Sequence, residues 1–159
     1  MIVVADSSPL HYLILIEQIE LLRRLYGEVW IPEAVANELL AGNAPRSVSE
    51  WVSAPPSWFA VVAVTDEEID SVSDTLDLGE RAAISLAEKI QADLLLIDES
   101  AGRAEAARRN LHVTGTLGVL RIAAEHDLID VSDVLARLRT TNFYVEEEFL
   151  RKVFAKWIG

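Results

Sequence analysis

Short apolar runs alternate along the chain with longer segments in which apolar side chains recur at helical spacing. The apolar runs predict buried strands, which lie at residues 2–5, 28–31, 59–64, 94–97 and 111–113. The helical spacing predicts helices at residues 8–26, 32–42, 66–76, 79–91, 101–109, 116–126, 131–139 and 145–157. The first of these segments fits either one long helix or two short ones. The proline-containing stretch 44–57 predicts a short helix inside a long connection.

The alternation of strands and helices predicts a largely parallel sheet with helices on both of its faces. The length of 159 residues fits a single domain over residues 1–159, because no repeat, low-complexity segment or linker interrupts the pattern. No segment is apolar over enough residues to cross a membrane. The first residues lack the basic and apolar stretches of a signal peptide, so we expect a cytoplasmic protein.

Acidic residues stand where the chemistry of such a sheet is usually found. Asp6 and Asp98 each come directly after a predicted strand. Active sites in open parallel sheets lie beyond the carboxyl ends of the strands, so both side chains share one crevice if their strands are neighbours. Two acids on predicted helices can join them. Glu38 lies midway along its helix, and Glu80 lies in the first turn of its own.

Such a group of acids suits a hard divalent cation. The chain has no cysteine, and its three histidines are scattered without metal-ligand spacing. Carboxylates from distant segments therefore favour Mg²⁺ or Mn²⁺. Without a cation, two carboxylates at about 4 Å repel by roughly 4 kcal/mol at an effective dielectric near 20. A bound cation would relieve that repulsion, acidify a water molecule and neutralise charge on a scissile phosphate.

Each acid also has a purely structural interpretation. Asp6 can cap the helix that follows it, and Asp98 can begin another. Asp77 and Glu80 have the spacing of a capping box, which needs no catalysis. Glu38 can be a solvated residue at the edge of an apolar stripe. The combination of acids is more specific than any one of them.

Several segments resemble the PIN-domain family in order and spacing. The strand that ends in Asp6 and two serines resembles the opening of these proteins, and the proline-started helix with Glu38 resembles their second segment. Residues 76–98, with Glu80 and Asp98, resemble the third. Residues 114–118 complete the pattern of an uncharacterised PIN-like branch often found beside small antitoxin-like partners. The resemblance covers about residues 1–130 and leaves C-terminal helices at 131–159.

The resemblance implies a PIN-like three-layer α/β/α sandwich and a metal-dependent endoribonuclease. It is similar to the toxin half of VapBC-type toxin–antitoxin pairs, which implies an RNA substrate, a small antitoxin-like partner and a homodimer. Carried over residue by residue, the catalytic and metal-binding acids would be Asp6, Glu38, Glu80 and Asp98. Family members usually have aspartate where Glu80 stands, which changes the reach of that side chain.

Further residues can support this site. Glu99 or Thr116 can supply its last polar group, and Ser7 can support Asp6 or touch the substrate. For RNA, the basic candidates closest in sequence to the acids are Arg103, Arg108 and Arg109, although a solvated helix face is an equal interpretation of that group.

The charge of the chain favours a second hypothesis. The formal net charge is -12, whereas nucleic-acid affinity comes largely from lysine and arginine. Residues 66–80 are strongly acidic and contain no lysine or arginine, so they form either a solvated face or a docking surface for a basic partner. The alternative to a ribonuclease is therefore a catalytically weak or inactive PIN-like scaffold that acts as a protein-binding module.

Overall fold

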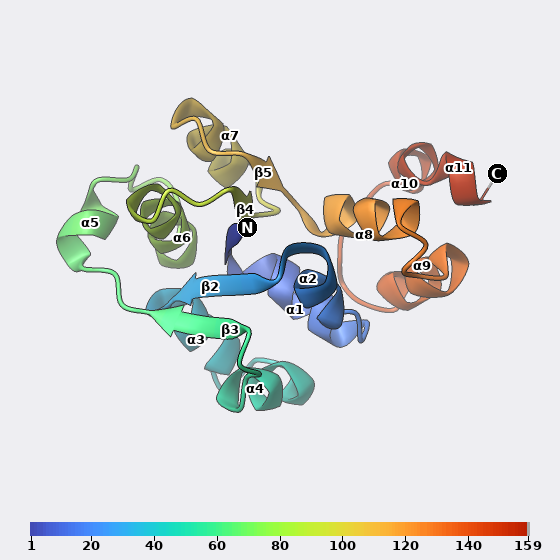
Figure 1. Cartoon of the computed structure of the whole chain (residues 1–159), viewed down its shortest axis with the longest axis horizontal. Helices are drawn as coiled ribbons and strands as arrows, with labels where there is room; N and C mark the ends of the chain where they lie inside the picture. The colour runs from blue at the N-terminus through green and yellow to red at the C-terminus, as the bar shows by residue number, and fades with distance from the viewer. Residues whose placement is uncertain (159) are drawn as a thin grey trace.

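The structure is a computed structural model that describes residues 1–158, and a five-stranded parallel sheet runs through its centre (Figure 1). The strand order is β3-β2-β1-β4-β5, and every neighbouring pair is parallel. The strands are β1 (Ile2–Ala5), β2 (Glu28–Pro32), β3 (Phe59–Val62), β4 (Leu94–Leu96) and β5 (Val113–Thr114). All of the predicted strands are present: β1 has the predicted bounds, and the others differ from the predicted ends by at most two residues.

Helices connect the strands and cover the sheet. They are α1 (Ser7–Leu15), α2 (Glu20–Tyr26), α3 (Glu33–Leu40), α4 (Arg46–Ser53), α5 (Asp66–Asp70), α6 (Leu78–Lys89), α7 (Ser100–Arg108), α8 (Thr116–Glu125), α9 (Val131–Arg139), α10 (Glu147–Val153) and α11 (Ala155–Ile158). The segment at 8–26 forms two helices, because the chain turns between them at Glu17, which has a φ of 60°. The predicted short helix within residues 44–57 is α4.

Two helix predictions are wrong in extent. The helix predicted at 66–76 ends at Asp70, and the chain beyond it forms local hydrogen bonds from serine and threonine side chains. Ser71 Oγ donates to the Glu68 carbonyl at 2.7 Å, and the hydroxyls of Ser73 and Thr75 lie 2.9 Å apart. Such side-chain bonds compete with helical ones. The helix predicted at 145–157 is divided at Phe154, whose side chain is fully buried.

The two faces of the sheet have separate apolar cores. Alternate residues of a strand point to opposite faces, so Val3 and Ala5 pack with α1, α2, α3, α4, α8 and α9, whereas Val4 packs with α6 and α7. On β4, Leu96 joins the first core and Leu95 the second. Helices therefore cover both faces, which confirms the three-layer α/β/α sandwich around a parallel sheet.

The order of the strands fixes where a site can form. The chain passes from β1 outward through β2 to β3, then returns to the other side of β1 to form β4 and β5. The order reverses between β1 and β4, and a crevice forms at the carboxyl ends of strands at such a point. Asp6 directly follows β1, and Asp98 follows β4 after Ile97. Within residues 1–158, no helix has the length and apolar character needed to cross a membrane.

Candidate active site

Asp6 lies at the centre of the switch point, between the ends of β1 and β4. Its backbone N–H donates to the Leu96 carbonyl at 2.8 Å, which fixes the residue against β4. The side chain is buried and does not cap α1, although Asp6 occupies the N-cap position. Its Oδ1 atom is buried and has no hydrogen-bond partner within residues 1–158. The capping interpretation of Asp6 therefore fails.

The environment of Asp6 opposes its ionisation. Burial raises the pKa of the carboxyl to about 8, and the negative charges of Glu38, Asp77 and Glu80 add to that rise. The backbone of Ser7 offsets only part of the effect. A buried carboxyl of this kind holds a proton at neutral pH unless a cation replaces it.

Glu80 combines a structural bond with a free oxygen. Its Oε1 accepts from the Asp77 N–H at 3.2 Å, and its own N–H donates to Asp77 Oδ1 at 2.8 Å, so the predicted capping box exists. Its Oε2 is buried and has no hydrogen-bond partner in the described chain. Burial, followed by contact with Asp77, raises the pKa of Glu80 to about 7. The capping box thus occupies one oxygen and leaves the other available.

Glu38 reaches the same region from α3. Its Oε2 accepts from Ser7 Oγ at 2.7 Å. Burial raises the pKa of Glu38, with a further contribution from the charge of Asp77, while the Ser7 hydroxyl and the Gly79 backbone oppose the rise. Glu38 is therefore an exposed residue whose carboxylate turns inward to meet the start of α6.

Asp98 lies on the other flank and is well supplied with donors. Its Oδ1 accepts from the Thr116 N–H at 2.7 Å, and its Oδ2 accepts from Thr116 Oγ1 at 2.7 Å and from Ser8 Oγ at 2.8 Å. Thr116 is the first residue of α8, and its side chain is completely buried. Two orienting residues hold the Asp98 carboxylate in place.

Consecutive serines connect the two flanks of the site. Ser7 donates to Glu38, and Ser8 donates to Asp98. Because both follow Asp6 in the first turn of α1, a single helix start fixes carboxylates from α3 and from the end of β4. Ser7 was expected to support Asp6 or touch substrate, whereas its hydrogen bond is to Glu38.

Glycines make the room that the carboxylates occupy. A Cβ added at Gly79 would collide with the Glu38 carboxylate, and one added at Gly115 would lie 2.5 Å from Asp98 Oδ1. At Gly102 it would lie 2.9 Å from Glu80 Oε2. Glycine at these positions therefore has a steric reason, which is the close seating of an acidic side chain.

Two cavities open beside these groups. The larger, about 890 Å³, includes Asp98, Glu99 and Arg103 in its lining. The smaller, about 380 Å³, includes Ser7, Glu38 and His11 in its lining. Both share Ser8, Tyr12 and Asn142, so the two cavities adjoin at these residues.

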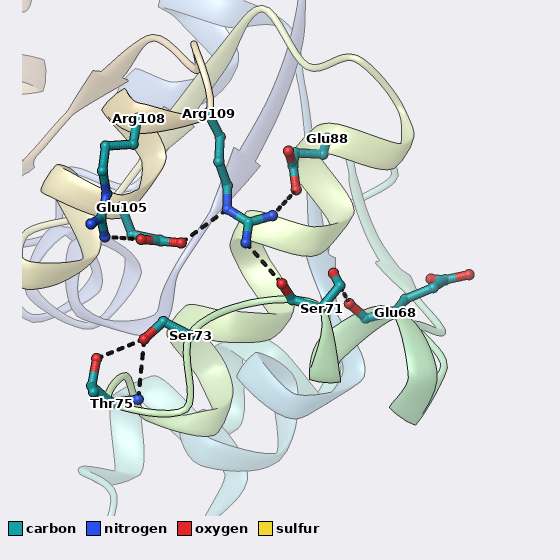
Figure 2. A network of polar contacts seen from close by, with 8 residues as sticks. All are labelled: Glu68, Ser71, Ser73, Thr75, Glu88, Glu105, Arg108 and Arg109. Carbon is teal, nitrogen blue, oxygen red and sulfur yellow. Dashed lines mark hydrogen bonds and ion pairs between the residues drawn. The ribbon is translucent and has the colours of Figure 1, made fainter.

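The three candidate arginines have different surroundings. Arg109 binds Glu88 at 2.6 Å, Glu105 at 3.1 Å and the Ser71 carbonyl at 2.9 Å (Figure 2). Arg108 also pairs with Glu105. Figure 2 shows both guanidinium groups in contact with Glu105. Arg103 is the member of the group that lines the larger cavity.

The acids form an extended array rather than a closed cage. Asp6, Glu38 and Glu80 act on one another together with Asp77, while Asp98 stands on the opposite flank with Thr116. Within residues 1–158, no three histidine, aspartate or glutamate side chains lie close enough as they stand to hold one ion. Glu99 acts electrostatically on Glu80 and lines the larger cavity.

Some members of the site were missed in the sequence. Asp77 was interpreted only as a cap, yet its charge acts on the three acids around it. Its position three residues before Glu80 was the available signal. Ser8 was missed as a partner of Asp98, and no sequence signal pointed to Tyr12 or Asn142, which meet across 130 positions of the chain.

Comparison with known proteins agrees with this architecture. No curated protein matches the chain. A family model described as a PIN domain matches residues 2–158. PIN domains are typically nucleases, so the match indicates a nuclease-type function in general. Because it spans nearly the whole sequence, the chain belongs to the PIN-domain family.

Proposed function

We propose that this protein is a metal-dependent endoribonuclease that hydrolyses RNA phosphodiester bonds. The observation that carries the proposal is Asp6, a buried carboxyl with an unpartnered oxygen at the switch point of a parallel sheet. Unpartnered buried oxygens are rare in folded proteins and often mark a functional site. The negative charges of Glu38 and Glu80 act on the same carboxyl.

The residues present suit a divalent cation in their chemistry. The unpartnered oxygens of Asp6 and Glu80 are hard donors, which Mg²⁺ and Mn²⁺ prefer. We propose Asp6, Glu38, Glu80 and Asp98 as the groups that hold the ion. A bound cation would neutralise charge on the scissile phosphate and make the attacking water more acidic.

The chain itself orients these groups. Ser7 holds Glu38, and Ser8 with Thr116 holds Asp98, so the carboxylates keep their places while substrate enters. Groups that orient a ligand in this way contribute 10–100-fold to metal affinity or activity in typical sites, as a rough guide. Arg103, on the wall of the larger cavity, is the proposed phosphate contact.

The test is a titration of Mn²⁺ into the purified protein, followed by melting temperature and by cleavage of single-stranded RNA. Asp6→Asn and Asp98→Asn should abolish the metal-dependent rise in melting temperature and reduce cleavage by at least about 100-fold. Asp66→Asn, on the exposed helix α5, is the matched control and should behave as the wild type. Wild-type protein that neither responds to Mn²⁺ nor cuts RNA would overturn the proposal.

A second candidate function is a protein-binding module on a PIN-like scaffold. The observation in its favour is that the acids of residues 1–158 are not gathered into a group that could hold one ion as they stand. The titration separates the two functions, because a binding module predicts no Mn²⁺ response that depends on Asp6 and Asp98.

We also propose that the chain is the toxin half of a toxin–antitoxin pair and acts as a homodimer in the cytoplasm. The family membership and the exposed acids Asp66, Glu67 and Asp74 support this, because they could receive a basic segment of a small antitoxin-like protein. Expression of the wild type should arrest growth of host cells, and Asp98→Asn should restore it. Normal growth with active wild-type protein would exclude the toxin role.

A further inference from the structure

The larger cavity extends well beyond the carboxylates. Asp98 and Glu99 line it near the ends of the strands, and Tyr144 and Phe149 line it at the far side. Its volume of about 890 Å³ lies at the upper end of the range of small-molecule sites. The site therefore continues into a space that the acids themselves do not occupy.

The far wall comes from the C-terminal part of the chain and is fixed in place. The Tyr12 hydroxyl donates to Asn142 Oδ1 at 2.8 Å, and the ring of Tyr12 meets that of Phe143 edge to face, with centroids 4.9 Å apart. The segment that follows is tied down by the ion pair of Arg139 with Glu147 at 2.8 Å. The wall is thus held against α1 before Tyr144 and against the end of α9 after it.

Exposed aromatic side chains stand on this wall, and basic side chains complete the lining of the cavity. Tyr144 is 85% exposed and Phe149 is 54% exposed, although the rest of the chain buries most of its large apolar residues. Arg103 from α7 and Arg121 from α8 also line the cavity. Arg121 has only an exposed pair with Glu125, at 3.5 Å, and such pairs are weak enough to exchange partners.

We propose that this cavity binds an unpaired nucleotide of the RNA next to the scissile phosphate. The inference rests on the proposed ribonuclease function and adds to it the residues that position the strand. Tyr144, with Phe149, offers a face on which a base can stack, and Arg103 and Arg121 neutralise the adjoining phosphates. Aromatic rings combined with arginines along a groove are the usual means of holding single strands.

The shared lining of the two cavities favours a nucleic-acid strand over a folded partner. Ser8, Tyr12 and Asn142 line both, so the second cavity, which has Glu38 and Asn43 in its lining, adjoins the first. A strand has this elongated shape, and its bases are free to stack only when unpaired. A base-paired duplex keeps its base faces hidden, so the cavity selects against it.

The experiment measures binding of a fluorescein-labelled oligoadenylate to the full chain by anisotropy, with EDTA present and at about pH 6, where Asp6 and Glu80 carry less charge. The same strand annealed to its complement is the duplex probe. Tyr144→Ala should weaken single-strand binding about 10-fold, and Tyr144→Phe should restore it. Arg103→Ala and Arg121→Ala should each weaken binding and lower its salt dependence.

Val61→Ala, an exposed apolar residue of β3 outside the cavity, is the matched control and should bind as the wild type. Equal binding of single strand and duplex, or unchanged binding by Tyr144→Ala, would overturn the inference. So would a Tyr144→Ala variant that binds normally but loses a dimer seen by light scattering, since the wall would then be an interface between copies. RNA cleavage with unchanged KM in Tyr144→Ala would leave the ribonuclease standing without this subsite. If the wild type did not cleave RNA but its binding still depended on Tyr144, the subsite would stand and the ribonuclease proposal would fail.

Discussion

Two buried glutamates on neighbouring helices have opposite environments. Glu105 on α7 meets Arg109 and Arg108, and these partners lower its pKa. Glu80 on α6 faces Asp77 and Glu99, and burial raises its pKa to about 7. Both residues are almost inaccessible to solvent, at 8% and 5% exposed. One carboxylate is supplied with cations by the chain, and the other is not.

The difference separates acids that hold helices together from acids that belong to the candidate site. The network around Glu105 joins α7 to α6 through Glu88 and to the loop after α5 through the Ser71 carbonyl (Figure 2). The carboxylates around Glu80 repel one another, because each negative charge raises the pKa of its neighbours. An acid kept in such surroundings indicates a requirement imposed by a ligand.

Removing Arg109, a cationic partner of the buried Glu105, should have the largest effect on stability. Arg109→Met should lower the free energy of unfolding by about 2–4 kcal/mol, because it breaks several charge-assisted bonds and leaves Glu105 with one partner. Urea unfolding of the variant measures this. Arg108→Met is the control, since its side chain is 71% exposed, and it should change stability by less than about 1 kcal/mol. Equal losses in both variants would show that Arg109 is not the central member of the network.

An effect of pH on stability is expected from the unsatisfied acids Asp6 and Glu80. Asp6 and Glu80 have native pKa values of about 8 and about 7, above their ordinary values of 3.8 and 4.5. The native state therefore binds more protons in this window, and the stability of metal-free protein should fall as pH rises from about 5 to 8.

The double variant Asp6→Asn with Glu80→Gln should remove most of this slope, because neither amide titrates. Urea unfolding at both pH values, with EDTA present, measures the change. A slope equal to that of the wild type would mean that other groups carry the pH dependence. Added Mn²⁺ should restore wild-type stability at the higher pH but leave the double variant unchanged.

The smallest effect on stability is expected from Gly102→Ala, which fills space beside the Glu80 carboxylate. A Cβ at Gly102 would lie 2.6 Å from Ile97 Cδ1 and 2.9 Å from Glu80 Oε2. Gly102→Ala should therefore cost about 1 kcal/mol, because the crowding exceeds the gain in helix propensity. The Mn²⁺-dependent rise in melting temperature should also shrink. Gly42→Ala has open space around its Cβ and serves as the control. A more stable Gly102→Ala with an unchanged Mn²⁺ response would show that this glycine does not seat Glu80.

The fold could be predicted from the sequence because its main signals are local. Apolar runs and helical spacing place the strands and most helices, and an acid directly after a strand predicts Asp6 and Asp98 at the carboxyl edge of the sheet. The pairing of β1 with β4, on which their meeting depends, follows from the chain order only once the sheet is known. From the sequence alone, Asp6 and Asp98 are expected to meet only if their two strands are neighbours.

The rest of the site depends on contacts between distant segments. Whether Arg109 is free or paired depends on the packing of α7 against α6 and the loop after α5, which no spacing reveals. The wall that carries Tyr144 is fixed by Tyr12 from α1. The pKa of Asp6 rises mainly through burial, and burial of a polar residue at the end of a strand is decided by the whole fold.

The pairing of β1 with β4 also has a consequence for biosynthesis. Val4 and Leu95 are neighbours in the sheet, so the central strand receives its second partner only after more than half of the chain has been made. Closing so long a loop is slow in folding, and a nascent chain forms its domain as a unit. Asp6 and Asp98 therefore cannot meet in a nascent chain that has not yet reached residue 98. The candidate site stays unassembled through the first half of its own synthesis.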